Sequence, residues 1–149
     1  MARPDSLPRP TRFPNLRSEI HVGRFSYDFA THGGAVGAIP LRGVFPAGAM
    51  IIGGHLEVIT TCTTASADSG TGALHIKNAN DIVTATAVSA GSNIWDAGLQ
   101  KIAPTLATAA TLIKLTADSQ VIFTIAVAAF TAGRFNGYLQ YVMSETYEY

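Results

Sequence analysis

The stretch LRGVFPAGAMIIGGHLEVITTCTTA, from Leu41 to Ala65, decides the fold class of this chain. It is nearly free of charge, because only Arg42 and Glu57 are formally charged. A membrane-spanning helix needs about 20 consecutive apolar residues, and these charges, Pro46 and the pair Gly53-Gly54 interrupt the run. The β-branched run VITTCTT favours a strand over a helix. The sequence therefore predicts a long strand.

Alternate positions of this strand differ in character, which is typical of a strand with one buried face. The turn Pro46-Ala47-Gly48 leads into it, and we expect a bend at Gly53-Gly54. We expect Cys62 to pack as a small apolar residue. The set predicted to face a core is Met50, Ile52, Gly54, Leu56, Val58, Thr60 and Cys62, and the opposite, mixed set is Ile51, Gly53, His55, Glu57, Ile59, Thr61 and Thr63.

Period-two patterning also begins at Ser18, in the segment SEIHVGRFSYDFAT. Ile20 and Val22 share one phase, and the apolar residues Phe25, Tyr27 and Phe29 share the other. Gly23 stands where the phase changes. A glycine at a change of phase predicts a β-bulge.

The middle of the chain is punctuated by loop residues. ASADSGTG is a loop by composition, and ALHIKN is a short strand with Leu74 and Ile76 facing inward. The segment SNIWDAGLQKIAP predicts one helical turn capped by Ser92 or Asn93. Trp95, the single tryptophan, should be buried.

The C-terminal third predicts a three-strand meander of TLIKLT, QVIFTIAVAAF and RFNGYLQYVMSE, joined by the short turns ADS and TAG. Short strands at nearly regular spacing indicate an all-β fold. We predict a single antiparallel β-sandwich domain over residues 18–149, jelly-roll-like, preceded by an extended arm over residues 1–17. The alternation in these strands runs through Val121, Phe123, Ile125 and Val127 and through Phe135, Leu139, Tyr141 and Met143. The predicted core comprises Val121, Phe123, Ile125, Phe135, Leu139 and Tyr141.

The arm, MARPDSLPRPTRFPNLR, holds four of the chain's seven prolines and four arginines against one acid. Proline at this density forbids a helix and favours extended backbone. Arginines can fork onto carboxylates, and apolar side chains between them can fill pockets. The alternative to a docking arm is a disordered tail. The predicted partner-binding residues are Arg3, Arg9, Arg12, Phe13, Leu16 and Arg17.

The composition predicts association with other chains. Charged residues make up only 13% of the sequence, against ~25% in an average globular protein. A surface rich in Ala, Thr, Gly and Ser hydrates weakly, so we expect much of it to be covered in an assembly. The formal net charge is zero, which gives no global field for nucleic acid. The single cysteine allows no internal disulfide.

No motif in the chain predicts catalysis, a cofactor or a metal. The four histidines lack metal-site spacing, although His55 and His75 could lie on one face if their strands pair. The HGG at His32 lacks the nucleophile elbow that an esterase needs. The acids are scattered singly, and Asp28 has no evident role. Three acids stand in turns, where Asp caps backbone N–H groups: Asp68, Asp81 and Asp118.

The segments PLRGVFPAGAMIIGGHLEVITT, SADSGTGALHIK and FTAGRFNGYLQYV together resemble a group of phage virion proteins. The resemblance spans roughly residues 37–142 and rests on Pro46-Ala47-Gly48, Ser69-Gly70-Thr71 and Thr131-Ala132-Gly133 to Tyr141. Members of this group are structural, as capsid decoration (cement) or head-fibre subunits, with some tail-associated members. The arm is not part of the pattern.

The resemblance implies a virion protein on the capsid surface, assembled in the host cytoplasm, with no catalytic residue. It implies the major capsid protein and further copies of the chain as partners, with a homotrimer expected. The zero net charge and the interrupted apolar run separately predict no contact with nucleic acid or membrane. Two other functions stay open: a tail or neck component, and a carbohydrate-binding module. The latter needs exposed coplanar aromatics, for which Tyr138, Tyr147 and Tyr149 are the outward candidates.

Overall fold

A computed structural model describes residues 19–104, 108 and 110–144 of the chain. The predicted arm, residues 1–17, lies outside this range, and so does the boundary between arm and domain. Two short helical turns, α1 (Phe29–His32) and α2 (Ala65–Asp68), accompany eight strands. The strands are β1 (His21–Asp28), β2 (Gly37–Phe45), β3 (Ala49–Thr64), β4 (Thr71–His75), β5 (Val83–Ala87), β6 (Gly98–Ile102), β7 (Ser119–Ala126) and β8 (Phe130–Met143).

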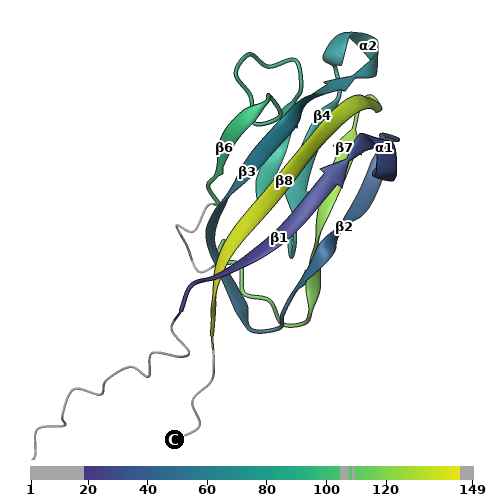
Figure 1. Ribbon diagram of the computed structural model, residues 1–149. Coiled ribbons are helices and arrows are strands. Elements are labelled where there is room, and N and C mark those ends of the chain that lie inside the picture. Colours follow the sequence, from purple (N-terminus) through teal and green to yellow (C-terminus); the bar gives the residue numbers. More distant parts are fainter. Residues whose placement is uncertain (1–18, 105–107, 109, 145–149) are drawn as a thin grey trace, which may run out of the picture.

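The strands form two four-stranded antiparallel sheets that pack face to face (Figure 1). The sheet nearer the viewer, called the front sheet, has the order β1-β8-β3-β6, and the back sheet has the order β2-β7-β4-β5. Strand β1 pairs with β8, β2 with β7, β3 with β6 and β4 with β5. This nesting is that of one long hairpin rolled into a sandwich, which defines a jelly roll. The predicted fold class is confirmed.

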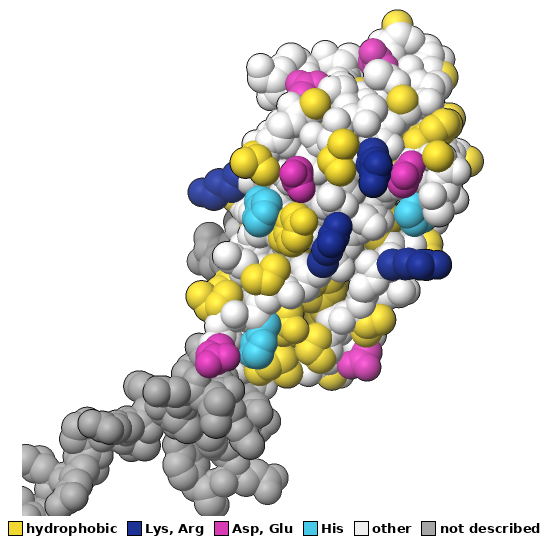
Figure 2. Space-filling view, viewed as in Figure 1, with side chains coloured by type: hydrophobic (Ala, Val, Ile, Leu, Met, Phe, Trp, Pro, Cys, Tyr) yellow, Lys and Arg dark blue, Asp and Glu magenta, His cyan; other side chains and the backbone are white. Residues whose placement is uncertain are grey.

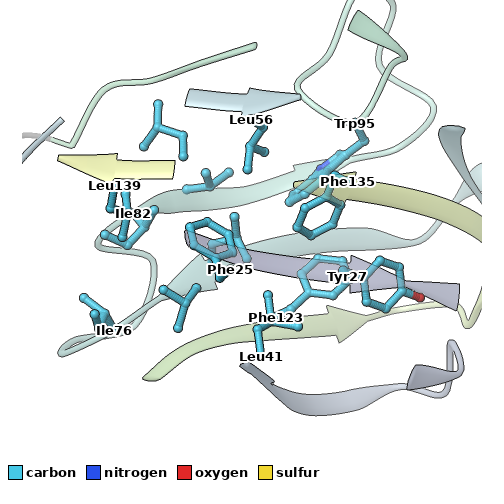
Figure 3. Packing of buried hydrophobic residues seen from close by; sticks show 14 of the residues in the cluster. Phe25, Tyr27, Leu41, Leu56, Ile76, Ile82, Trp95, Phe123, Phe135 and Leu139 are labelled. Atoms are coloured by element: carbon cyan, nitrogen blue, oxygen red, sulfur yellow. The ribbon is translucent and has the colours of Figure 1, made fainter. Parts of the chain in front are cut away.

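An aromatic cluster fills the space between the sheets (Figure 3). The Phe123 ring of the back sheet lies 4.8 Å from the Tyr27 ring and 5.4 Å from the Phe135 ring of the front sheet, between ring centroids. Trp95 is fully buried against both Phe123 and Phe135, as predicted. One continuous core therefore holds the two sheets together.

Gly23 does not form the predicted β-bulge. The register between β1 and β8 runs without a shift from His21 to Asp28. Gly23 lies in the same inward phase as Phe25, and a Cβ there would lie 2.0 Å from the Phe45 ring. Ile20 and Val22 point outward, with 59% and 58% of their surface exposed. The apparent change of phase arises because an inward position has no room for a side chain.

Strand β3 changes phase at the predicted bend. The register with β8 shifts between Ile51 and Gly53. Beyond the bend, Leu56, Val58 and Cys62 are buried as predicted. Before it, the expected face is wrong, because Ala49 and Ile51 are buried instead of Met50 and Ile52. The extra residue at the bulge reverses the side-chain alternation.

The predicted C-terminal meander is wrong. Strand β7 belongs to the back sheet and β8 to the front sheet, so the two do not pair. The segment TLIKLT makes only an isolated bridge from Lys114 to Met50, and the TAG sequence lies inside β8. A tight turn at Val127, where Ala128 N–H donates to the Ala126 carbonyl at 2.9 Å, sends the chain across the sandwich.

Most of the predicted core positions of these strands are nevertheless buried: Val121, Phe123, Ile125, Phe135 and Leu139. Tyr141 and Met143 are only partly buried. Val127 is 74% exposed, because it stands at the turn and not in a strand. The alternation therefore identifies the buried face but not the partner sheet.

The segment around Asn93 forms a turn and not the predicted helical turn. The Asn93 side chain donates to the carbonyl oxygens of Val88 and Ala90 and accepts from Trp95 N–H at 2.7 Å. Asparagine often directs a loop in this way. The turn delivers Trp95 into the core and starts β6.

Candidate interaction surfaces

All six residues predicted to bind a partner through the arm lie outside the described part of the chain: Arg3, Arg9, Arg12, Phe13, Leu16 and Arg17. The described chain begins at Glu19, two residues before β1. Their role stays a prediction. The described candidate surfaces are formed by the sandwich.

Three aspartates serve the backbone, as predicted from their turn contexts. Asp81 accepts from the N–H groups of Ile76, Lys77 and Asn78 at 2.8–3.0 Å. Asp68 accepts from Thr64 N–H at 2.7 Å, and Asp118 accepts from Ala47 N–H at 2.9 Å. These carboxylates fix loops at the two ends of the sandwich.

Asp28, which had no evident role in the sequence, and the HGG sequence at His32 lie together where β1 ends and α1 follows. Asp28 caps α1 by accepting from Ala30 N–H at 2.9 Å. Gly33 adopts a φ of 72°, a left-handed backbone conformation that glycine adopts without strain. The Tyr27 hydroxyl donates to the Gly33 carbonyl at 2.8 Å and closes this turn. These contacts hold the turn that follows β1.

Within residues 19–104, 108 and 110–144, no three His, Cys, Asp or Glu residues come close enough to hold a metal ion. His55 is on β3 of the front sheet and His75 is on β4 of the back sheet, so these strands do not pair. In the same residues, no helix has both the length and the apolar character needed to cross a membrane.

Two weakly acidic groups point into the core from the front sheet. Burial, followed by the nearby Asp96, raises the pKa of the Cys62 thiol from 9.0 to about 12. Burial, followed by Cys62 and Asp28, raises the pKa of the Tyr27 phenol well above its usual value. Both groups are neutral at physiological pH, and Cys62 is a packed apolar residue as predicted.

A row of polar side chains crosses the outer face of the front sheet. The register places Arg24 opposite Tyr138, Tyr138 opposite His55, and His55 opposite Lys101. The His55 ring stacks on the Tyr138 ring at 4.8 Å, and the Arg24 guanidinium lies over the same ring at 5.8 Å. Figure 2 shows histidine and basic side chains spread over the visible face.

These contacts argue against Tyr138 as a surface on which a carbohydrate could stack. Its neighbours come from the strands on either side, with His55 on β3 and Arg24 on β1. The ring is therefore held from both sides, which removes the flat open face that a carbohydrate ring would use. The other two candidate tyrosines, Tyr147 and Tyr149, lie outside the described residues.

The outer face of the back sheet has the opposite character. Strands β2, β7, β4 and β5 carry Arg42 as their only Asp, Glu, Lys or Arg. Thr124 is flanked by Ala38 and Ala73, and Ile122 is flanked by Pro40 and His75. This weakly charged face could not be located from sequence, because its rows depend on the register of strands distant in the chain.

The jelly roll defined by these strands is shared with known structures, although no protein-family model and no curated protein matches the sequence. Three solved structures of phage capsids contain chains with this fold. The resemblance of the chain to phage virion proteins, first seen in its turn and strand motifs, is thus confirmed at the level of the fold.

A chain of the cyanophage Pam1 capsid asymmetric unit has 17% identity and a TM-score of 0.65, over 95% of this chain and 97% of that one. A chain of the capsid of Ralstonia phage GP4 has 20% identity and a TM-score of 0.61, over 93% of each chain. A chain of the acid-stable capsid of Helicobacter pylori bacteriophage KHP30 has 13% identity and a TM-score of 0.58, over 90% of this chain and 97% of that one.

Proposed function

We propose that this chain is a structural virion protein of a phage and that it acts as a capsid decoration (cement) subunit. One observation carries the proposal. The match to chains of phage capsid structures covers 90–95% of this chain and 93–97% of those chains, so the likeness involves almost the whole of each. A fold alone does not define a function. The small number of charged residues independently supports the proposal, because a weakly charged surface favours association with other chains.

The proposed attachment is multivalent. The sandwich and the proline-rich arm each contact the major capsid protein or neighbouring copies, and linked contacts add through effective concentration. A prestiffened arm loses less entropy on docking than a flexible one. We expect the subunits to associate as homotrimers, on the outer surface of the capsid.

The alternatives are distinguished by specific features. A tail or neck component would use the same fold and the same weakly charged surface, so only its position in the particle separates it from a decoration subunit. A carbohydrate-binding module is disfavoured because both sides of the Tyr138 ring are occupied. An enzyme is disfavoured because, in the described residues, no three His, Cys, Asp or Glu side chains come together as a metal-dependent active site would require.

The proposal is tested by sedimentation of the protein with undecorated particles. We expect full-length protein to pellet with the capsids, and a variant lacking residues 1–17 to bind more weakly while its circular dichroism stays that of a folded β-protein. Binding of the full-length protein should weaken as salt rises, since exposed ion pairs are screened over about 8–10 Å at ordinary ionic strength.

Two results would overturn parts of this proposal. Absence of binding to capsids, with binding to isolated tails, would assign the chain to the tail. Equal binding by full-length and truncated protein would leave the arm without a role in attachment. Light scattering of the free protein checks the homotrimer separately, and a stable monomer at high concentration would contradict it.

A further inference from the structure

A groove lined by three arginines lies at the edge of the sandwich where β1 passes β2. Its volume is about 330 Å³, and Arg24, Arg42 and Arg134 line it together with Ser26 and Asn136. Pockets of this size accept a few side chains or a small ligand. In Figure 2 the dark blue side chains on the right half of the visible face surround this region.

The backbone explains why arginines from both sheets meet here. Gly43 has a φ of 117°, and a Cβ at this position would lie 2.3 Å from the Arg24 carbonyl oxygen. Strand β2 therefore touches β1 directly, which only glycine permits. The pairing of β2 with β7 also shifts register between Pro40 and Val44. Arg42, inside this irregular stretch, is exposed beside Arg24.

The charge of the groove is only partly balanced. Asp28 is the only acid among the lining residues, and its Oδ2 lies 3.8 Å from Arg134 Nε. Asp28 also caps α1. Two other titratable residues line the groove. The Tyr27 hydroxyl donates to the Gly33 carbonyl, and the Nδ1 of His32 lies 3.1 Å from the Asp28 backbone nitrogen. In the described part of the chain, no acid lies within ion-pair distance of Arg24 or Arg42. Three cations against one anion favour an acidic occupant.

We propose that this arginine groove binds residues 144–149 of a second copy of the chain. Their sequence, SETYEY, carries Glu145 and Glu148 and no basic residue. Two carboxylates can pair with Arg24 and Arg42, since guanidinium groups bind carboxylates in forked geometry. Tyrosines next to these acids add surfaces over which arginine can stack, as Arg24 already does over Tyr138.

The chain's own residues 144–149 are poorly placed for this groove. Strand β8 ends at Met143, whereas its groove residues, Arg134 and Asn136, lie seven or more positions back along the strand. Seven residues of strand span about 23 Å. To return, the chain would have to reverse, and a tight reversal uses four residues. Of the six residues 144–149, only two would then remain to span this distance.

The basic arm is excluded as the occupant by its charge. Residues 1–17 hold four arginines and one aspartate, so they would be repelled from a groove of the same sign. The acidic segment and the groove thus form a complementary pair, with the two members on different copies. This contact is independent of the capsid, because it is made between subunits.

The experiment exchanges the charges. The groove variant is Arg24→Glu with Arg42→Glu, and the segment variant is Glu145→Lys with Glu148→Lys. Self-association is measured by sedimentation velocity at low and high salt, with circular dichroism and thermal unfolding as controls for folding. We expect each variant alone to associate about tenfold more weakly than the native protein. An equimolar mixture of the two variants should regain association, because each groove then meets a segment of opposite charge.

Three outcomes would overturn the proposal. The first is unchanged association of the segment variant. The second is failure of the mixture to recover while both variants remain folded. The third is that only the groove variant changes and what it loses is binding to capsids, which would identify an acidic surface of the particle as the occupant. Loss of capsid binding by all forms, with self-association intact, would instead count against the capsid function and leave this contact standing.

Discussion

The two sheets of this jelly roll share one core but differ on their outer faces. The front sheet carries Arg24, Asp28, Glu57, Lys101 and Arg134 on its strands. The back sheet carries only Arg42. Both are built of the same alternating strand pattern, so the difference is not required by the fold.

The difference indicates how each face meets its surroundings. Charged groups resist removal from water, because their lost hydration must be replaced by well-placed partners. Thr, Ala and Pro side chains are covered by another protein at far lower cost, and charged residues are depleted from the centres of protein interfaces. We therefore expect the front face to stay hydrated, with contacts limited to ion pairs, and the back face to be the one that is covered on the particle.

The largest effect should come from breaking the core that both sheets share. Phe123 is fully buried, and its ring centroid lies within 5.4 Å of those of Tyr27, Trp95, Phe130 and Phe135. Phe123→Ala should lower the free energy of unfolding by about 3–5 kcal/mol. Chemical denaturation measures this. The control is Val44→Ala on the exposed edge of the back sheet, with an expected change within about 0.5 kcal/mol. A loss of less than 1 kcal/mol for Phe123→Ala would contradict the assigned core.

The second effect is a dependence of stability on pH that comes from the front sheet alone, because Cys62 and Tyr27 are the titratable side chains that point into the core. Cys62 has a folded pKa of about 12 against 9.0 when free, and the phenol of Tyr27 is shifted in the same direction. Above about pH 9 the unfolded thiol loses its proton while the folded one keeps it. Stability is therefore full below pH 9 and falls as pH rises toward 12, by at most about 1.4 kcal/mol per pH unit for each group.

Urea midpoints between pH 7 and 11 measure this alkaline loss. Cys62→Ala should start less stable at pH 7, because a buried sulfur is removed, but should lose less stability between pH 9 and 11 than the native protein. Parallel curves for the two proteins would show that Cys62 is not the titrating group. Thiol reagents provide a second check, since the folded protein should react slowly at pH 8.

The third effect concerns the bend in β3 and has a matched control in the neighbouring residue. A Cβ on Gly54 would lie 2.3 Å from the Tyr138 carbonyl oxygen, whereas a Cβ on Gly53 would meet only the Gln140 side chain at 3.7 Å. Gly54→Ala should cost about 1–3 kcal/mol through overpacking. Gly53→Ala should be neutral or slightly stabilising, because alanine loses less backbone entropy. Equal effects in thermal unfolding would contradict the observed register at the bend.

Local patterns predict much of this molecule. Alternation identifies most buried positions, from Leu56 and Val58 to Phe123 and Leu139, and turn chemistry predicts the roles of Asp68, Asp81 and Asp118. These features depend on neighbours close in sequence. A strand's inward face follows from its own period of two, whatever sheet it joins.

The features that sequence reasoning missed are set by distant contacts. The predicted meander was wrong because the same alternation fits two arrangements. Consecutive strands can pair within one sheet, or they can face each other across the core from two sheets. Gly23 was misread because its lack of a side chain is imposed by Phe45, more than 20 positions away. The arginine groove likewise needs β1, β2 and β8 together. No signal in one segment could have revealed these sites.

The smallest expected effect on stability, and the most direct test of the comparison, comes from adding one negative charge to each outer face. Ala38→Glu places it on the back face beside Thr124, and Gln140→Glu places it on the front face beside Val22. Both native side chains are exposed, so unfolding free energies should change by no more than about 0.5 kcal/mol.

Capsid binding should respond unequally to the two substitutions. If the back face is covered, the new carboxylate at residue 38 must lose water without a partner, and binding should weaken about tenfold or more. The front-face variant should bind as the native protein does, because its charge stays in water. Sedimentation with undecorated particles measures both. Weaker binding by Gln140→Glu than by Ala38→Glu would reverse the assignment of the two faces.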